Sequence, residues 1–118
     1  MQEIDFSDRF DDILAKDGRY APRAYNILMD VLCYLTSEAK RVSSWDIMDE
    51  FRSTALSQYG AMSYYVLDAL GIHSTKDLGE MVANLQEFRR IGRDHRISLE
   101  AFAAGYDFKE AFLSPYAV

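Results

Sequence analysis

Apolar side chains recur at helical spacing along most of the chain. An apolar residue is followed three or four positions later by another, and this period lines one face of an α-helix. Pro22 stands where a helix begins, since its missing N–H and restricted φ suit a first helical turn. The pattern predicts about five helices, over residues 6–14, 22–35, 45–59, 61–70 and 75–88.

Start and stop signals support these bounds. Ser43 precedes Asp46 by the three residues of a capping box in its weaker aspartate form. The same spacing joins Ser74 to Asp77 before the last predicted helix. Two of the predicted helices are followed by a glycine, the residue that most easily adopts the left-handed conformation of a helix end, at Gly60 and Gly71.

The apolar stripes of these helices predict the core. The methionines at core spacing, Met48, Met62 and Met81, are expected to fill gaps in it. We expect the remaining core residues to be Phe10, Ile13, Leu28, Val31, Leu32, Leu35, Phe51, Val66, Leu70, Leu78, Val82 and Leu85.

The helical period breaks after residue 88. Residues 89–91 are a candidate short strand and 92–94 a turn, after which residues 95–99 return as a second strand or Ser98 caps a short helix. We therefore predict a mainly α-helical single domain, 1–118, with a small C-terminal hairpin. A helix over 75–88 followed by a basic turn and a return strand is similar to the recognition helix and wing of winged helix-turn-helix domains.

Several runs of the chain resemble a bacterial family of conserved hypothetical proteins found chiefly in Planctomycetes and Verrucomicrobia. The resemblance implies a shared fold, and it carries over no activity, cofactor or catalytic residue, because none is assigned to that family. Residues 87–91 depart from it where similar proteins have a Gly-Leu-Leu step into the last hairpin. The runs that carry the resemblance are residues 19–20, 24–25, 42–44, 55–60, 66–67, 71–80 and 105–112.

Composition and charge narrow the class of protein. The chain has 118 residues, 49% of them hydrophobic, which fits one globular domain and excludes a largely disordered one. Its start is acidic, unlike a signal peptide, and it has no apolar run of the ~20 residues that span a bilayer. The lone Cys33 cannot form an internal disulfide. We expect a soluble protein of a reducing, bacterial-type cytoplasm, with a eukaryotic cytosol left open, and no membrane association.

The residue types that carry chemistry are sparse. Cys33 lies in the most apolar predicted helix, which raises the pKa of a thiol and disfavours a reactive thiolate. His73 and His95 have no other ligand at the spacing of a local zinc site. Pairs such as Asp46 with Asp49 share a helix face, where a solvated surface is a simpler interpretation than a divalent-ion site. No nucleophile elbow, phosphate loop or dinucleotide motif is present, so we expect no enzyme, no metal and no cofactor.

Aromatic residues are the first candidate partner surface. Tyrosine and tryptophan favour half-buried positions and interface hot spots, although they also cap the edge of a core. We predict that the chain is a non-enzymatic interaction module that binds another protein or itself through such a surface. The candidate residues are Trp45, Tyr59, Tyr64 and Tyr65.

A cluster of arginines is the second candidate surface. Four arginines face a single acid, Asp94, between positions 89 and 96, and they suit phosphates or an acidic partner. They suit equally well a structural role, with their stems on the core and their charges paired with acids. The alternative function is a winged-helix nucleic-acid-binding regulator, but the net charge of −6 disfavours nucleic acid, and we expect no useful duplex binding at physiological salt. The residues are Arg89, Arg90, Arg93 and Arg96.

Overall fold

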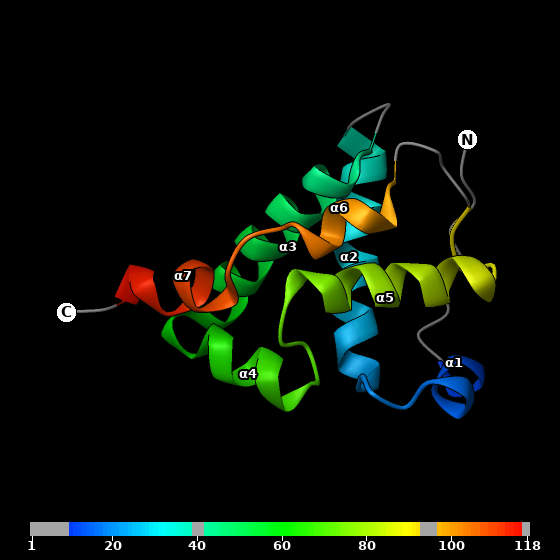
Figure 1. The fold of residues 1–118 in the computed structure, drawn as a ribbon, viewed down its shortest axis with the longest axis horizontal. Coiled ribbons are helices and arrows are strands. Elements are labelled where there is room, and N and C mark those ends of the chain that lie inside the picture. Colours follow the sequence, from blue (N-terminus) through cyan, green and yellow to red (C-terminus); the bar gives the residue numbers. More distant parts are fainter. Residues whose placement is uncertain (1–9, 39–41, 93–96, 117–118) are drawn as a thin grey trace.

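Helices joined by short loops form the regular structure of this chain. The computed structural model describes residues 10–38, 42–92 and 97–116. The predicted mainly α-helical single domain is confirmed, as one compact body of 44 × 31 × 24 Å (Figure 1). The elements are α1 (Asp11–Lys16), α2 (Pro22–Glu38), α3 (Ser44–Tyr59), η1 (Gly60–Met62), α4 (Ser63–Ala69), α5 (Thr75–Glu87), α6 (Leu99–Ala103), α7 (Phe108–Phe112) and η2 (Ser114–Tyr116), where η marks a 3₁₀ turn.

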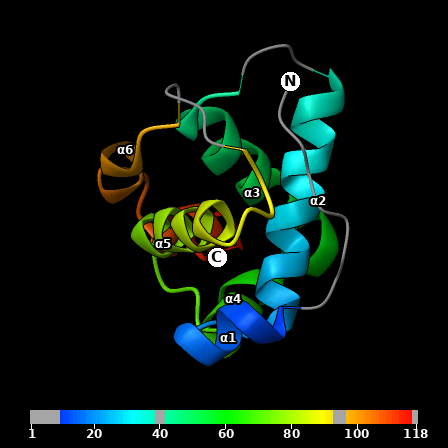
Figure 2. The same ribbon diagram turned by 90° about the vertical axis from the view of Figure 1, so that its right-hand side faces the viewer.

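Helix α5 lies at the centre of this arrangement. Figure 2 looks along α5 and shows α2, α3 and α6 around it, with α1 and α4 below. The most extensive helix contacts join α2 to α3 and α5 to α6. Helices α4 and α7 pack together near the C-terminal end of α3. Because α5 is central, the elements packed around it determine which of its faces remain uncovered and could contact a ligand or partner.

Most of the predicted core is buried. Leu35, Val66 and Leu70 are only half-buried. The prediction for Met62 was wrong, since its side chain is 59% exposed. The reason is the turn η1, which changes the phase of the helix before α4 begins at Ser63 and so points Met62 outward. The confirmed core residues are Phe10, Ile13, Leu28, Val31, Leu32, Met48, Phe51, Leu78, Met81, Val82 and Leu85.

The helix ends follow the predicted signals with one exception. The capping box of α3 is complete, with Ser43 and Asp46 each accepting the other's backbone N–H. At α5 the Ser74 side chain makes no capping bond, and the Asp77 carboxylate instead accepts the His73 N–H at 2.8 Å. The positive φ expected after two helices is observed at Gly60 and Gly71.

The predicted C-terminal hairpin is not observed in the described part of the chain. Arg89 has a φ of +57°, and the N–H of Arg90 returns to the carbonyl of Leu85, so residues 89–90 end α5 rather than start a strand. Leu99 begins α6 with Ser98 at the N-cap position, which is the short-helix alternative. Residues 93–96, which include most of the predicted turn over 92–94 and the start of the candidate return strand over 95–99, lie outside the described residues.

Candidate functional site

An open pocket lies where the first turn of α5 meets the loop between α6 and α7. Its volume of about 450 Å³ falls within the range of small-ligand and side-chain pockets. Residues from three separate segments of the sequence, at position 64, over 73–76 and over 103–109, form its walls. The lining residues that bear on function are Tyr64, His73, Lys76, Tyr106, Phe108 and Lys109.

Close packing fixes the loop that forms one wall of the pocket. A Cβ atom at Gly105 would come within 2.4 Å of Thr75 Oγ1 and 2.7 Å of Met48 Sδ, so only glycine lets the loop approach this closely. Thr75 Oγ1 donates a hydrogen bond to the Phe102 carbonyl at 2.6 Å, and the Tyr106 hydroxyl donates to the Met48 carbonyl at 2.8 Å. Burial raises the pKa of Tyr106 above its ordinary value. The wall is therefore a fixed surface.

Two lysines carry positive charge at the pocket. Lys76 and Lys109 are both exposed, and neither forms an ion pair with a described residue. Asp107 also lines the pocket, but its carboxylate caps α7 by accepting the Glu110 N–H at 3.1 Å. The pocket thus has two cationic groups available to a ligand or partner.

His73 is oriented from two sides. Its Nδ1 lies 2.8 Å from Asp68 Oδ1, with both side chains 60% exposed, and its backbone N–H donates to Asp77. The other Asp77 oxygen accepts the hydroxyl of Tyr20 at 2.6 Å. This edge of the pocket is therefore tied to the loop between α1 and α2.

The four aromatic residues predicted to form one partner surface lie in different parts of the structure. Tyr64 lines the pocket, and the Tyr65 ring meets it edge to face at 5.5 Å between centroids. Tyr65 is 56% exposed. Trp45 is exposed in the first turn of α3, whereas Tyr59 ends that helix and accepts a hydrogen bond from Arg23. Of the four, only Tyr64 lines the pocket, and Tyr65 adjoins it through the ring of Tyr64.

The arginines do not form one described surface. Arg90 is only 8% exposed, and its guanidinium lies 5.2 Å from the centre of the Phe10 ring and 3.0 Å from Asp12. This is the structural alternative, in which an arginine packs on the core and pairs with an acid. Arg89 is exposed, while Arg93 and Arg96 lie outside the described residues.

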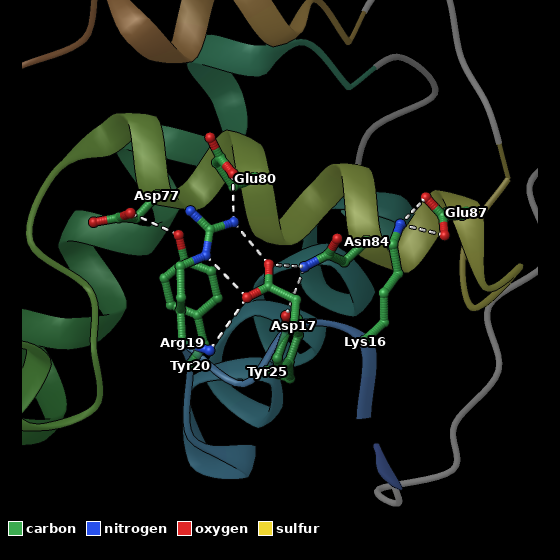
Figure 3. A network of polar contacts seen from close by, with 9 residues as sticks. All are labelled: Lys16, Asp17, Arg19, Tyr20, Tyr25, Asp77, Glu80, Asn84 and Glu87. Atoms are coloured by element: carbon green, nitrogen blue, oxygen red, sulfur yellow. Dashed lines mark hydrogen bonds and ion pairs between the residues drawn. The ribbon is translucent and has the colours of Figure 1, made fainter. Parts of the chain in front are cut away.

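A network of polar contacts covers a second side of α5 (Figure 3). We call it the α5 clamp, meaning Lys16 at the end of α1 and Asp17, Arg19 and Tyr20 of the α1–α2 loop, with the α5 residues that they bind. Lys16 pairs with Glu87, and Arg19 joins Asp17 to Glu80. Tyr20 binds Asp77 at the opposite end of the helix from Glu87. The clamp therefore extends along the whole of α5.

Asn84 forms the buried centre of the clamp. Its amide nitrogen donates to Asp17 Oδ2 and to the Tyr25 hydroxyl, each at 3.0 Å. The hydrogen bonds from Arg19 hold the pKa of Asp17 well below its usual range, and that pairing raises the pKa of Arg19. Burial raises the pKa values of Tyr20 and Tyr25. These groups are satisfied by one another, which identifies the clamp as a structural network.

Sequence reasoning missed both the pocket and the clamp. The pocket joins positions 64 to 109 and the clamp joins positions 16 to 87, so no local spacing reveals either. The one local sign of the pocket is Gly105, which separates a short helix from the capping residue Asp107.

The described residues contain neither a candidate metal site nor a helix able to span a membrane. Within 10–38, 42–92 and 97–116, no group of three His, Cys, Asp or Glu side chains could hold a metal ion. Cys33 is half-buried, and desolvation raises the pKa of its thiol as expected. None of the described helices has the length and apolar character needed to cross a membrane. No protein-family model, curated protein or solved structure matches the chain, so the family resemblance stays a prediction.

Proposed function

We propose that this protein is a non-enzymatic interaction module that binds a protein partner through the α4 surface. The α4 surface consists of Met62, Tyr64 and Tyr65 together with the adjoining pocket. The observation that carries the proposal is the exposure of two large apolar side chains, Met62 at 59% and Tyr65 at 56%, of which Tyr65 contacts the pocket-lining Tyr64.

The chemistry of this surface is that of an interface. Met62 and Tyr65 are three residues apart and so lie on one side of the chain as η1 passes into α4. Aromatic residues and methionine are enriched where proteins meet, because they bury a large area and lose little conformational freedom. A partner that covered both side chains would also approach Tyr64, whose ring contacts that of Tyr65 and lines the pocket.

Binding is better supported than catalysis. Asp68 orients His73 at the pocket as it would orient a general base, but no described hydroxyl or thiol bonds to the other ring nitrogen. The nucleic-acid alternative has less support, because the buried face and the clamp cover much of α5 and Arg90 is inside. The side-chain amide nitrogen of Asn84 on α5 is bound to Asp17 and Tyr25, so it does not face outward to read a base.

Affinity capture with matched variants tests the proposal. The bait is the full chain as wild type, as the double variant Met62→Ser with Tyr65→Ser, and as Tyr34→Ser. Tyr34 is the control because it is equally exposed, at 52%, on α2. We expect a protein captured by the wild type and the control to be depleted about tenfold or more with the double variant, as for a hot spot. A second copy of this chain counts as a partner and is recognised by solution mass. Equal capture by all three baits, each shown to be folded by circular dichroism, would overturn the proposal.

A further inference from the structure

Lys76 and Lys109 are the two Lys or Arg residues that line the pocket, and what sets them apart is this position, since Arg23, Arg52 and Arg89 also form no ion pair with a described residue. Lys16, Arg19 and Arg90 each pair with an acid of the chain itself. Lys76 and Lys109 line one pocket, and neither has such a partner among the described residues. A shortage of acids is not the reason, because the chain has 19 acidic and 13 basic residues. The fold leaves these two charges available where the pocket opens.

Two acids at the edge of the pocket already have donors. The Asp107 carboxylate accepts the Glu110 N–H, and the Asp68 carboxylate lies against His73. Neither acid forms an ion pair with Lys76 or Lys109 within the described residues. An incoming carboxylate would therefore complete the charge pairing of the pocket.

Aromatic rings form part of the pocket wall. The Tyr106 and Phe108 rings stack with centroids 6.0 Å apart at 20°, and Tyr64 of α4 lines the same pocket. Such a surface combines apolar contact with cationic groups. A small inorganic anion would use only the charges, whereas a peptide with acidic and apolar side chains uses both.

We infer that the partner segment received by this pocket is an acidic peptide. Its carboxylates would pair with Lys76 and Lys109, and an apolar side chain would contact Tyr64 and Phe108. The inference rests on the proposed function and names the chemistry of the partner at that same α4 surface.

The charge of the whole protein favours a short acidic segment over a nucleic acid. A chain with a net charge of −6 repels a long polyanion where the polyanion extends beyond the lysines. A short peptide with a few carboxylates would contact the two lysines and feel little repulsion from the other acidic groups of the protein. Salt screens that repulsion over about 8 Å at physiological ionic strength. We therefore expect the peptide to bind and duplex DNA not to bind.

A nuclear magnetic resonance titration tests the inference directly. The ¹⁵N-labelled full chain is titrated with acetylated, amidated peptides in which glutamates flank a central phenylalanine, leucine or tyrosine. Matched peptides have glutamine in place of glutamate. We expect the acidic peptides to shift the amide resonances of residues 73–76 and 105–109, with the matched peptides at least about tenfold weaker.

Two variants assign the effect to the lysines. The double variant Lys76→Gln with Lys109→Gln should weaken the acidic peptides about tenfold or more. Arg89→Gln removes one exposed charge at the far end of α5 and should leave the affinity unchanged. Absence of shifts with every acidic peptide, equal binding of the glutamine peptides, or unchanged binding by the double variant would overturn the inference. Shifts caused by a short DNA duplex instead of the peptides would overturn it in favour of nucleic-acid phosphate.

The same lysine variant used as bait separates this inference from the proposed function. Capture lost with the Met62→Ser, Tyr65→Ser bait but kept with the Lys76→Gln, Lys109→Gln bait would leave the interaction module standing and overturn the acidic partner. Capture unchanged by both would overturn the interaction module itself. Capture lost with both, together with the lysine-dependent peptide shifts, supports the two proposals.

Discussion

Gly79 in the middle of α5 lies directly against Phe102 of α6. A Cβ atom at position 79 would stand 2.7 Å from Phe102 Cβ and 3.0 Å from Cγ, closer than real side chains pack. Both residues are buried. The missing side chain lets α6 approach α5, and the chain that follows α6 then forms the wall of the pocket.

A side chain at position 79 should destabilise the protein. Alanine at this position gains about 1 kcal/mol of helix propensity over glycine. We expect the clash with Phe102 to outweigh that gain, so that Gly79→Ala lowers the free energy of unfolding by about 1–2 kcal/mol net. Urea denaturation measures the change. Gly18→Ala is the control, because its Cβ would meet only the Leu14 carbonyl oxygen at 3.6 Å. A more stable Gly79→Ala protein would contradict the close packing described here.

Replacing the buried amide of the clamp by an acid should lower the free energy of unfolding more than the same replacement at a less buried position of α5. Asn84→Asp removes both donated hydrogen bonds and places a second carboxylate beside Asp17. We expect the free energy of unfolding to fall by about 2–4 kcal/mol at neutral pH, measured by urea denaturation. Gln86→Glu makes the same chemical change two residues away at a half-buried position of α5, and should cost less than about 1 kcal/mol. Equal losses would show that Asn84 has no special role.

The ionisation of Asp17 should make the free energy of unfolding depend on pH in the acid range. Its pKa is lower in the folded protein than in the unfolded chain, so its contribution is complete above the unfolded value of about 4 and is lost as the pH falls below that. Arg19 stays charged throughout this range. We expect Asp17→Asn to be less stable than the wild type near pH 6, with the difference shrinking steadily below pH ~4. Urea denaturation across the acid range measures both proteins. A difference that does not change with pH would exclude this role for Asp17.

The buried tyrosines should resist ionisation at alkaline pH. The pKa values of Tyr20, Tyr25 and Tyr106 are raised, with burial the first cause of each, and Asp77 adds to the shift of Tyr20. A pKa raised on folding contributes stability below the unfolded value of about 10, and this stability is lost as the pH rises above it. We expect ultraviolet absorbance to show a group of tyrosines that ionises only when the protein unfolds, and this group should include Tyr20, Tyr25 and Tyr106. The variant Tyr20→Phe should reduce this group by one residue. Ionisation of all tyrosines in a single step of the folded protein would contradict the burial.

Local signals identified the helices well and the turns unevenly. The capping box at Ser43 was predictable because both of its partners lie within one turn of helix. The same spacing at Ser74 was misleading, since Asp77 bonds to His73 and to Tyr20, which lies far earlier in the sequence. Met62 was misplaced for a related reason: its helical spacing is correct, but η1 interrupts the helix there.

The candidate site was predictable only in part. Tyr64 and Tyr65 were identified from their residue type, which favours interfaces in any context. Lys109, Tyr106 and Gly105 were not, because they reach the pocket only when α6 packs on α5. Arg90 belonged to a convincing basic cluster, yet the fold places it against Phe10 and Asp12.

The sequence by itself determined the helical class of the protein, the greater part of its core and the acidic balance of its surface. These properties depend on the period of apolar residues and on counts of side chains, which do not require knowing where each helix lies. Only the tertiary structure decided which charges are satisfied and which remain available. Lys16 and Lys76 are alike as residues, but Lys16 meets Glu87 across the fold while Lys76 faces an open pocket. Electrostatic energy depends on the distance between charges, and helix packing sets those distances between residues that are remote in the chain.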